Sequence, residues 1–587
     1  MKPTLYILIS AIFVLSMHSC EKEGHQSTPN VLLIITDDQG FGDMGYYGNH
    51  HIKTPVMDSL AEKSLRLTNF YVSPVCAPTR ASLMTGRYSL RTGVHDTYNG
   101  GAIMATEEVT MAELFKTAGY RTGLFGKWHL GDNYPSRPMD QGFDESVMHL
   151  SGGMGQVGDF TTWFEGDSAY FNPVLWHNGQ KKSYSGYCSD IFTREAIDFM
   201  IKESPEPFFC YLSFNAPHTP LQVPQKYLDM YEDIDPESGF EDKQGRFPSM
   251  NNRDKEAARR VYAMVTNIDD NMRRLFNQLK ERSLLENTLV IFMTDNGPQQ
   301  RRYIAGMRGR KGSVYEGGVR VPCFWSWPAR FEEAGDINET TAHIDVLPTL
   351  ADMCNIPIPP GVELDGKSLL SLMEDEQNAL PDRALFLYWT RRYPEKYNNI
   401  GWRRGDFKLV GHTDYDAPLS SFELYDISED PFELNNLVEG KRDRAGIYKK
   451  ELDSMYHALV NSPNLKDPPR AVIGHQRENP VVLNRNDAAG ERGIWAHEEV
   501  YGYWNVRILE GNYTVRFKFI QPVKGDGKMV METGTTIHVK EHSQDSTDMI
   551  VWENVSLSDG ECRLIPHYDV GRRRIFPFWV EFEKITD

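Results

Sequence analysis

The chain has 587 residues, a formal net charge of −19, and ordinary shares of apolar (40%) and charged (25%) residues. The length predicts more than one domain, and the composition is that of a globular protein. The negative charge argues against nucleic acid or an anionic membrane surface as the main partner. It would also repel an anionic substrate, so a site for one needs its own concentrated positive groups.

Residues 1–20 have the pattern of an export signal. Lys2 is followed by the apolar run Leu5–Leu15, which is too short to span a bilayer. Cys20, with charged residues directly after it, is similar to a bacterial lipoprotein acceptor. Two alternatives stay open, namely cleavage and secretion, or membrane attachment through a lipidated Cys20. Both predict an exported protein of the periplasm or cell surface, and the scattered remaining cysteines predict no disulfide framework.

Four apolar runs in the first half of the chain predict strands. They are Val31–Thr36, a shorter run through Leu124 and Phe125, Phe208–Phe214 and Leu289–Thr294. Unbroken runs of this kind suit strands that are buried on both faces of a mainly parallel sheet. Helical patterns lie between them, at Met111–Ala118, Asp190–Ile201 and Lys255–Arg282. We therefore expect an α/β fold whose functional groups lie at the carboxyl ends of the strands, where polar residues follow each run.

Oxygen-bearing side chains follow two of these strands. Asp37 and Asp38 come directly after the first run, and Asp295 and Asn296 directly after the last. Two strand ends of this kind favour a hard cation such as Ca²⁺ or Mg²⁺, which prefers oxygen ligands. The alternative is that the acidic pairs only form turns or cap the next helix.

The segment Ser73–Tyr88 carries the sequence Cys76-x-Pro78-x-Arg80 at the head of a predicted short helix. Pro78 suits a first helical turn, and Gly86 suits the end of the helix. Cys76 would then face free backbone N–H groups at the positive end of a helix, where an anion can be held. Such a position predicts a reactive thiol with a lowered pKa. The alternative is a half-buried structural cysteine.

This segment resembles the signature of the type I, formylglycine-dependent sulfatases, which is Cys-x-Pro-x-Arg followed by small residues and Thr-Gly-Arg. The resemblance implies an alkaline-phosphatase-like fold, with the mostly parallel sheet flanked by helices. It also implies that a formylglycine-generating maturation enzyme oxidises Cys76 to 3-oxoalanine (formylglycine), which is hydrated to a diol and becomes the nucleophile. The implied metal is Ca²⁺ in preference to Mg²⁺, with the ligands Asp37, Asp38, Cys76, Asp295 and Asn296.

Further motifs match the same family in its order along the chain. In Gly126–Gly131 the resemblance implies that Lys127 contacts the sulfate and His129 contacts the formylglycine hydroxyl. In Ala216-Pro217-His218 it implies that His218 protonates the leaving group. In the glycine-rich loop Gly309–Arg320 it implies that Lys311 binds the sulfate. By the same resemblance Arg80 holds the nucleophile, Asp37 is a candidate to assist its attack, and Ser151 is a further substrate contact.

The resemblance covers residues 28–460, which we expect to form the catalytic domain. A strand-and-turn segment at Phe422–Leu437 and a helix at Arg444–Val460 should end it, and the Pro/Asn/Asp-rich stretch Asn461–Pro469 is the predicted boundary. Residues 470–587 predict a β-rich, sandwich-like accessory domain. Its predicted strands are around Tyr513–Phe519, Thr535–Val539, Met549–Val555 and Phe576–Phe582. Its tryptophans, either core residues or platforms for sugar rings, are Trp495, Trp504, Trp552 and Trp579.

The resulting hypothesis is a hydrolase that removes sulfate from a sulfated glycan or sugar, in preference to a simple aryl sulfate. One alternative is a phosphate or phosphonate ester hydrolase of the same superfamily, because fold and metal site do not choose sulfur over phosphorus. The other is a non-catalytic, sugar-binding surface protein on a sulfatase scaffold. A further set of residues has two alternative interpretations, as contacts to a sugar carboxylate or second sulfate, or as solvated surface. These residues are Arg301, Arg302, Tyr303, His177 and Arg404.

Overall fold

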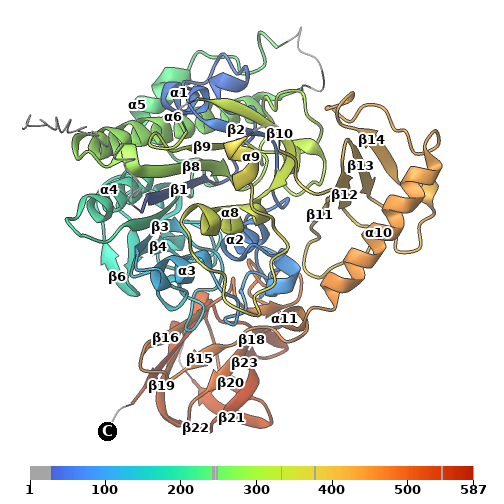
Figure 1. Cartoon of the computed structure of the whole chain (residues 1–587). Coiled ribbons are helices and arrows are strands. Elements are labelled where there is room, and N and C mark those ends of the chain that lie inside the picture. The colour runs from blue at the N-terminus through green and yellow to red at the C-terminus, as the bar shows by residue number, and fades with distance from the viewer. Residues whose placement is uncertain are drawn as a thin grey trace, which may run out of the picture.

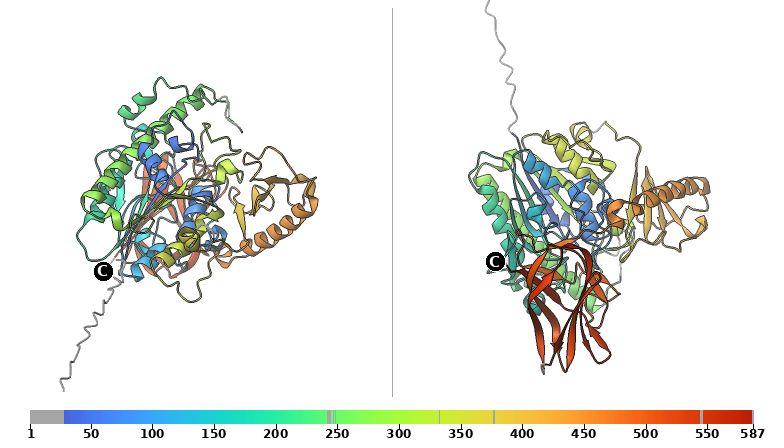
Figure 2. Two further views of the ribbon diagram at one scale, coloured as in Figure 1. Left: turned by 45° about the horizontal axis from the view of Figure 1, so that its top comes forward. Right: turned by 90° about the horizontal axis from the view of Figure 1, so that it is seen from below.

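The computed structural model describes residues 28–240, 245, 247, 249–331, 333–375, 378–543 and 546–585. The predicted export signal and Cys20 lie outside these ranges. Within them, no helix combines the length and the apolar composition that crossing a membrane requires. The described chain forms a large α/β part, a small sheet with one long helix beside it, and a pair of sheets built from the C-terminal residues (Figures 1 and 2).

Ten strands of the described chain form the central sheet. In spatial order they are β10 (Gly335–Ala342), β2 (Leu65–Tyr71), β9 (Cys323–Ser326), β8 (Thr288–Thr294), β1 (Asn30–Thr36), β7 (Phe208–Ser213), β3 (Arg121–Lys127), β4 (Glu145–His149), β5 (Val174–His177) and β6 (Gln180–Ser183). The five middle strands, β8-β1-β7-β3-β4, run parallel. Strands β9, β5 and β6 are antiparallel to their neighbours. The mostly parallel α/β sheet that the apolar runs predicted is confirmed.

Helices cover both faces of this sheet (Figure 1). In β1, Val31, Leu33 and Ile35 enter one hydrophobic core and Leu32 and Ile34 enter the other, so every residue of the run is buried. The first core contains side chains of α2 (Cys76–Thr85), α3 (Met111–Thr117), α8 (Val346–Met353) and α9 (Leu370–Glu374). The second contains side chains of α1 (Pro55–Glu62), α4 (Cys188–Ile201), α5 (Gln225–Leu228) and α6 (Asn252–Glu281).

The parallel strands end level with one another, and this brings the polar clusters together. In the register, Thr36 of β1 lies beside Thr294 of β8, and Gly126 of β3 lies beside Ser213 of β7. The residues that directly follow these positions therefore share one edge of the sheet, as expected for the carboxyl ends of parallel strands.

A smaller sheet packs beside the loop that follows β8. Within the described ranges it consists of β11 (Ala384–Tyr388), β12 (Ile400–Arg404), β13 (Phe407–Gly411) and β14 (Glu423–Asp426), with α10 (Arg442–Val460) across it. A buried ion-pair network ties it to the loop, because Lys408 Nζ lies 2.8 Å from Glu316 Oε1 and 3.0 Å from Glu433 Oε1. Glu316 begins the short helix α7 (Glu316–Val319).

The C-terminal residues form two sheets around one core, below the central sheet in Figure 1. The larger, as far as it is described, has β15 (Ala471–Ile473), β17 (Ala489–Gly490), β18 (Gly502–Ile508), β20 (Gly527–Thr533), β21 (Thr536–His542), β23 (Gly560–Val570) and β24 (Arg573–Ile575). The smaller has β16 (Val481–Asn484), β19 (Gly511–Val523), β22 (Thr547–Leu557) and β25 (Trp579–Lys584). These mainly antiparallel sheets confirm the predicted β-rich C-terminal region.

Two details of the C-terminal expectations differ from the structure. The stretch 461–469 contains a helical turn, α11 (Pro463–Lys466), in addition to irregular chain. The last strand begins at Trp579 and not at Phe576, although Phe576 and Phe578 are buried like strand residues, and Pro577 between them has no N–H for a strand ladder. The boundary near residue 470 stays a prediction. Of the tryptophans, Trp504 and Trp552 are core residues.

Candidate active site

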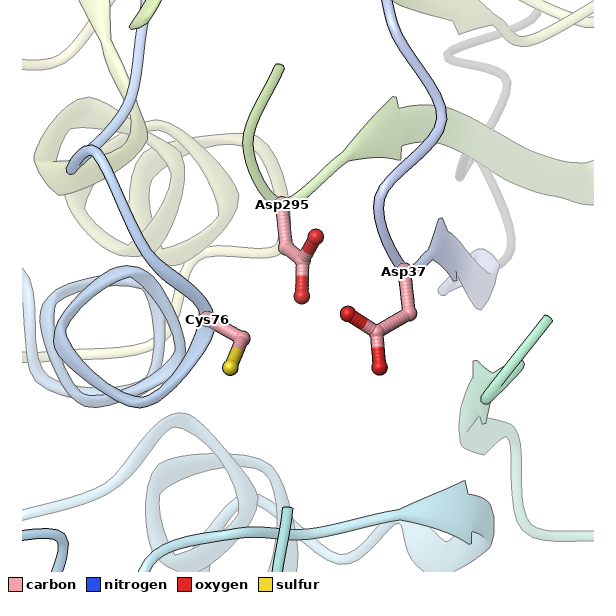
Figure 3. A group of neighbouring side chains, drawn as sticks. All are labelled: Asp37, Cys76 and Asp295. Atoms are coloured by element: carbon pink, nitrogen blue, oxygen red, sulfur yellow. The ribbon is translucent and has the colours of Figure 1, made fainter. Parts of the chain in front are cut away.

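Cys76 is the first residue of α2, and the helix ends at Gly86, which has a φ of 67° that favours glycine. The Cys76 side chain points toward the carboxylates of Asp37 and Asp295 at the ends of β1 and β8 (Figure 3). Its Sγ atom lies 3.4 Å from His129 Nδ1. The helix start therefore places the candidate nucleophile at the edge of the sheet where the polar clusters meet.

The expectation of a thiol with a lowered pKa is wrong. Cys76 is fully buried, and burial raises the pKa of its thiol, because the charged thiolate is poorly solvated there. Asp37 and Asp295 raise it further, against the opposite effect of Lys127 and Lys311. At neutral pH the unmodified side chain is thus a neutral thiol, which is a weak nucleophile.

Buried acidic side chains form the centre of the site. Ligand atoms of Asp37, Cys76 and Asp295 lie within 4.8 Å of one another, and the same holds for Asp37, Asp38 and His218. Asn296 joins this group through its Nδ2, which donates to Asp38 Oδ1 at 2.8 Å. The structure therefore brings together all five residues predicted as metal ligands.

The oxygen atoms of this cluster fit a hard cation. Asp37 Oδ1, Asp38 Oδ2 and Asn296 Oδ1 are buried and have no hydrogen-bond partner among the described residues. Buried polar atoms normally have partners, so three orphaned oxygens in one cluster point to a ligand that accepts their lone pairs. Carboxylate and amide oxygens are the ligands that Ca²⁺ prefers.

Two lysines bring positive charge to the same carboxylates. Lys127 Nζ lies 2.6 Å from Asp37 Oδ2, and Lys311 Nζ lies 2.6 Å from Asp38 Oδ1. Burial alone would raise the pKa of Asp37, but Lys127, His218 and Arg80 together hold it far below the usual value. The carboxylate is therefore charged at any pH at which the protein works. Lys311 lines the cavity beside Cys76, whereas Lys127 is fully buried and acts on Cys76 through its charge.

Arg80 acts on the acidic cluster, with no hydrogen bond to Cys76 in the described structure. Its guanidinium donates to Asp295 Oδ2 at 2.9 Å and to Ser213 Oγ at 2.5 Å. Burial and Asp37 raise the pKa of Asp295 to about 7, although Arg80 opposes this. Ser213, the last residue of β7, was not among the predicted residues, and only its position at a strand end could have indicated it.

The two histidines of the site are held in defined tautomers. His129 Nε2 donates to the Thr97 carbonyl oxygen at 2.8 Å, which leaves Nδ1 as an acceptor toward Cys76. His218 Nδ1 donates to the Thr219 carbonyl oxygen at 2.7 Å, so that Nε2 faces Asp38 Oδ2 at 3.8 Å. Burial lowers the pKa of both rings, helped by Lys127 at His129 and by Lys311 at His218. Both are therefore mainly neutral, with one free ring nitrogen each, at neutral pH.

A cavity of about 750 Å³ opens above this cluster. Cys76, His129, His218 and Lys311 line it at the bottom. Ser151 does not line it, because its backbone N–H donates to both carboxylate oxygens of Asp132 and the neighbouring Gly152 lies at the cavity instead. A substrate contact of Ser151 stays a prediction that its position does not favour.

The other residues considered for sugar contacts lie elsewhere. Arg302 is buried and donates to both oxygens of Asp43. Arg404 pairs with Asp382 and Glu451 on the small sheet, and His177 Nδ1 lies 2.8 Å from Tyr184 Oη. The cavity is also lined by residues that the sequence analysis did not indicate, which come from three distant segments. They are Tyr98, Trp389, Arg391, Arg492 and His497. Trp495, considered from the sequence as either core or sugar platform, also lines the cavity.

The site can hold an anion beside Lys311 and the buried side chain at position 76, which contacts His129, and the buried Lys127 adds positive charge. A second histidine presents its free nitrogen to the cavity, where it could exchange a proton with a leaving group. The carboxylates supply oxygen ligands for a cation that would share the negative charge of the anion. These features are those of a hydrolase for a charged ester.

Comparisons with known proteins agree with this geometry. A family profile described as "Sulfatase" matches residues 29–356, and one described as "N-sulphoglucosamine sulphohydrolase, C-terminal" matches residues 310–459. Human "Arylsulfatase A" is 31% identical over 462 residues, which cover 70% of this chain and 84% of that protein. The "N-acetylglucosamine-6-O-sulfatase" of Bacteroides thetaiotaomicron is 26% identical over 553 residues, covering 80% and 92%.

Solved structures share the fold. The structure titled "Crystal structure of Ps i-CgsB in complex with k-i-k-neocarrahexaose" aligns with a TM-score of 0.63 at 26% identity. The alignment covers 74% of this chain and 94% of that chain. The fold expected from the sequence resemblance, a mostly parallel sheet flanked by helices, is confirmed.

Proposed function

Because this chain belongs to the sulfatase family, we propose that it removes sulfate from a sulfated sugar or glycan. The nucleophile in this proposal is formylglycine, made from Cys76 by a maturation enzyme, and the metal is Ca²⁺. The observation that carries it is the position of Cys76 Sγ, which stands where the formylglycine oxygen would be. It lies 3.4 Å from His129 and within 4.8 Å of two carboxylates.

The chain's own residues have distinct tasks in this proposal. Lys127 and Lys311 bind the sulfate oxygens through charge-assisted hydrogen bonds. His129 Nδ1 accepts a proton from the group at position 76, and Thr97 keeps the ring in the required tautomer. His218 Nε2, once protonated, donates to the oxygen of the leaving sugar. Arg80 positions Asp295 and the end of β3.

Ca²⁺ would be held by Asp37, Asp38, Asp295 and Asn296, with the group at position 76, and it supplies positive charge next to the sulfate. Hydrated formylglycine supplies an oxygen nucleophile in place of the neutral thiol. Both fit the residues present, since three cluster oxygens are orphaned and the thiol itself is a weak nucleophile. We further propose export to the periplasm or cell surface, supported by the sequence pattern of residues 1–20.

Sugars are favoured over simple aryl esters as substrates because the cavity is larger than a sulfate needs. The relatives named above include one for N-acetylglucosamine 6-sulfate, and a related structure contains an oligosaccharide. The test is sulfate release from a panel of defined sulfated mono- and disaccharides, beside matched aryl sulfates and aryl phosphates. We expect sulfate release from a sugar. Phosphate release that exceeds sulfate release would favour the phosphate ester alternative.

A further inference from the structure

The C-terminal sheets contribute directly to the wall of the active-site cavity. The segment 491–501, between β17 and β18, brings Arg492, Trp495 and His497 to the cavity that contains Cys76. Hydrogen bonds fix its approach, since Gly490 N–H donates to Asn99 Oδ1 at 2.7 Å and Gly100 N–H donates to the Asn486 carbonyl oxygen at 3.2 Å. The cavity is therefore completed by residues beyond the two family-profile matches, which together end at residue 459.

A continuous row of aromatic rings and one guanidinium crosses this wall. Arg391 lies 4.7 Å from the Trp389 ring centroid and 5.0 Å from that of Tyr98. The Tyr98 and Trp495 ring centroids are 5.8 Å apart. The row begins next to Lys311, because a Trp389 ring atom lies 3.0 Å from where a Cβ on Gly312 would be. We call Trp389, Arg391, Tyr98, Trp495 and Arg492 the cavity wall.

The charge of this cavity is one-sided. Among the described residues that line the cavity, none is an aspartate or glutamate. Four are cationic, namely Arg310, Lys311, Arg391 and Arg492. Lys311 is the proposed sulfate ligand and pairs with Asp38, and Arg391 pairs with Asp96. Arg310 and Arg492 have no acidic partner among the described residues. In a chain of net charge −19 such an accumulation is unexpected unless the ligand carries more than one negative charge.

Two of these arginines are placed to bind an anion. Arg391 is held by Asp96 Oδ1 at 3.0 Å and Thr97 Oγ1 at 2.9 Å, and 49% of its side chain stays exposed. The exposed Arg492 guanidinium has no ion-pair or hydrogen-bond partner in the described part of the chain. Thr97 also accepts the hydrogen bond from His129, so the wall is joined rigidly to the catalytic group.

We propose that the cavity wall makes the enzyme specific for anionic sugars, which carry a carboxylate or a second sulfate besides the sulfate that is removed. Arg391 and Arg492 bind this second anionic group, since guanidinium groups match both anions with paired hydrogen bonds. Trp495 packs against the sugar ring, as aromatic side chains do in sites for partly apolar ligands. The inference rests on the proposed sulfatase function on sugars and names the substrate class.

The test measures binding, so that it does not depend on turnover. Full-length protein with Cys76→Ala is titrated calorimetrically with monosulfated hexosamines, their disulfated counterparts, and monosulfated disaccharides that contain a uronic acid. We expect saccharides with a second anion to bind about 10- to 100-fold more tightly than those without one, the range for hydrogen bonds to charged groups. The disulfated and uronic acid arms distinguish a second sulfate from a carboxylate.

Variants then assign the effect to the wall. Arg391→Gln and Arg492→Gln should each reduce the preference for the second anion to below about 10-fold, and Trp495→Ala should weaken binding of the preferred saccharide. Arg507→Gln is the matched control, because Arg507 lies on β18 of the same sheets, outside the cavity. Equal binding with and without the second anion, an unchanged preference in both arginine variants, or no binding at all would overturn the inference. The proposed function fails separately, if unmutated enzyme releases no sulfate from any of these sugars.

Discussion

Replacing His218 by alanine should reduce hydrolysis of a sulfated sugar far more than hydrolysis of 4-nitrophenyl sulfate. The ring lines the cavity and is oriented by its bond to the Thr219 carbonyl oxygen, which leaves Nε2 without a hydrogen bond, 3.8 Å from Asp38 Oδ2. A sugar hydroxyl is a poor leaving group and needs this proton, whereas 4-nitrophenolate leaves with little help. General acid catalysis contributes about 10²–10⁴-fold, or about 2.7–5.5 kcal/mol of barrier.

The structure narrows this range. Only 7% of His218 is exposed, so its truncation to alanine leaves a mostly enclosed space. Alanine opens space that water could enter and partly replace the donor, and we therefore expect a loss near the middle of the range, about 10³-fold, on the sugar. With 4-nitrophenyl sulfate the loss should stay below about 10-fold, because the proton contributes little there.

The assay is kcat/KM for both substrates in four proteins, namely the unmutated enzyme, His218→Ala, His218→Gln and His412→Ala. Glutamine can donate a hydrogen bond but cannot transfer a proton, so His218→Gln should behave like the alanine variant. His412 is an exposed histidine outside the cavity, and its variant should match the unmutated enzyme. Equal losses on both substrates for His218→Ala would refute the assignment of this residue as the proton donor.

Three further predictions concern the metal, a buried acid and a buried lysine. Exhaustive chelation should abolish activity, and Ca²⁺ but not Zn²⁺ should restore it. Asp295→Ala should reduce kcat by at least about 100-fold. Full activity after chelation would contradict the proposed metal site. Burial raises the pKa of Asp487, so native-state stability falls as pH rises toward that pKa, and Asp487→Asn should raise the Tm more at pH 8 than at pH 5. Asn486 Nδ2 now donates to Asp487 Oδ1. If the Asn486 amide turns over, its Oδ1, a buried acceptor without a partner among the described residues, can accept from the new amide. A pH-independent change in Tm would contradict this prediction. Lys408→Met leaves two carboxylates buried and uncompensated and should reduce the free energy of unfolding by about 3–5 kcal/mol in denaturant titrations, and a loss below about 1 kcal/mol would refute this.

Much of the fold could be predicted because the strands of the central sheet are buried on both faces. Such strands read as unbroken apolar runs, and Val31–Thr36 and Leu289–Thr294 differ from β1 and β8 by one residue each. The start of the last strand was less predictable, because Phe576 and Phe578 are apolar and buried like strand residues although they precede the strand. Short strands at this end of the sheet were harder to recognise, because β5 is only four residues long and the edge strand β6, with the sequence QKKS, has no apolar residue.

The bottom of the site could be predicted from motifs, whereas its wall could not. Cys76 begins a helix, and Lys127 and the acidic residues lie at strand ends, so local sequence indicates where they lie. Lys311 lies in the long loop after β8 and was indicated by its glycine-rich motif alone. The pKa of Cys76 depends on burial by distant chain, and the expectation from the helix start alone was therefore wrong. Tyr98, Arg391 and Trp495 come from three segments that only the tertiary structure brings together.

The mass of the peptide that contains position 76 tests the central claim most directly. Conversion of cysteine to formylglycine lowers that mass by about 18 Da, and this can be measured in preparations matured to different extents. We predict that the rate of sulfate release is proportional to the converted fraction and that Cys76→Ala releases none. Full activity in protein that carries only the unmodified thiol at position 76 would contradict the proposed nucleophile.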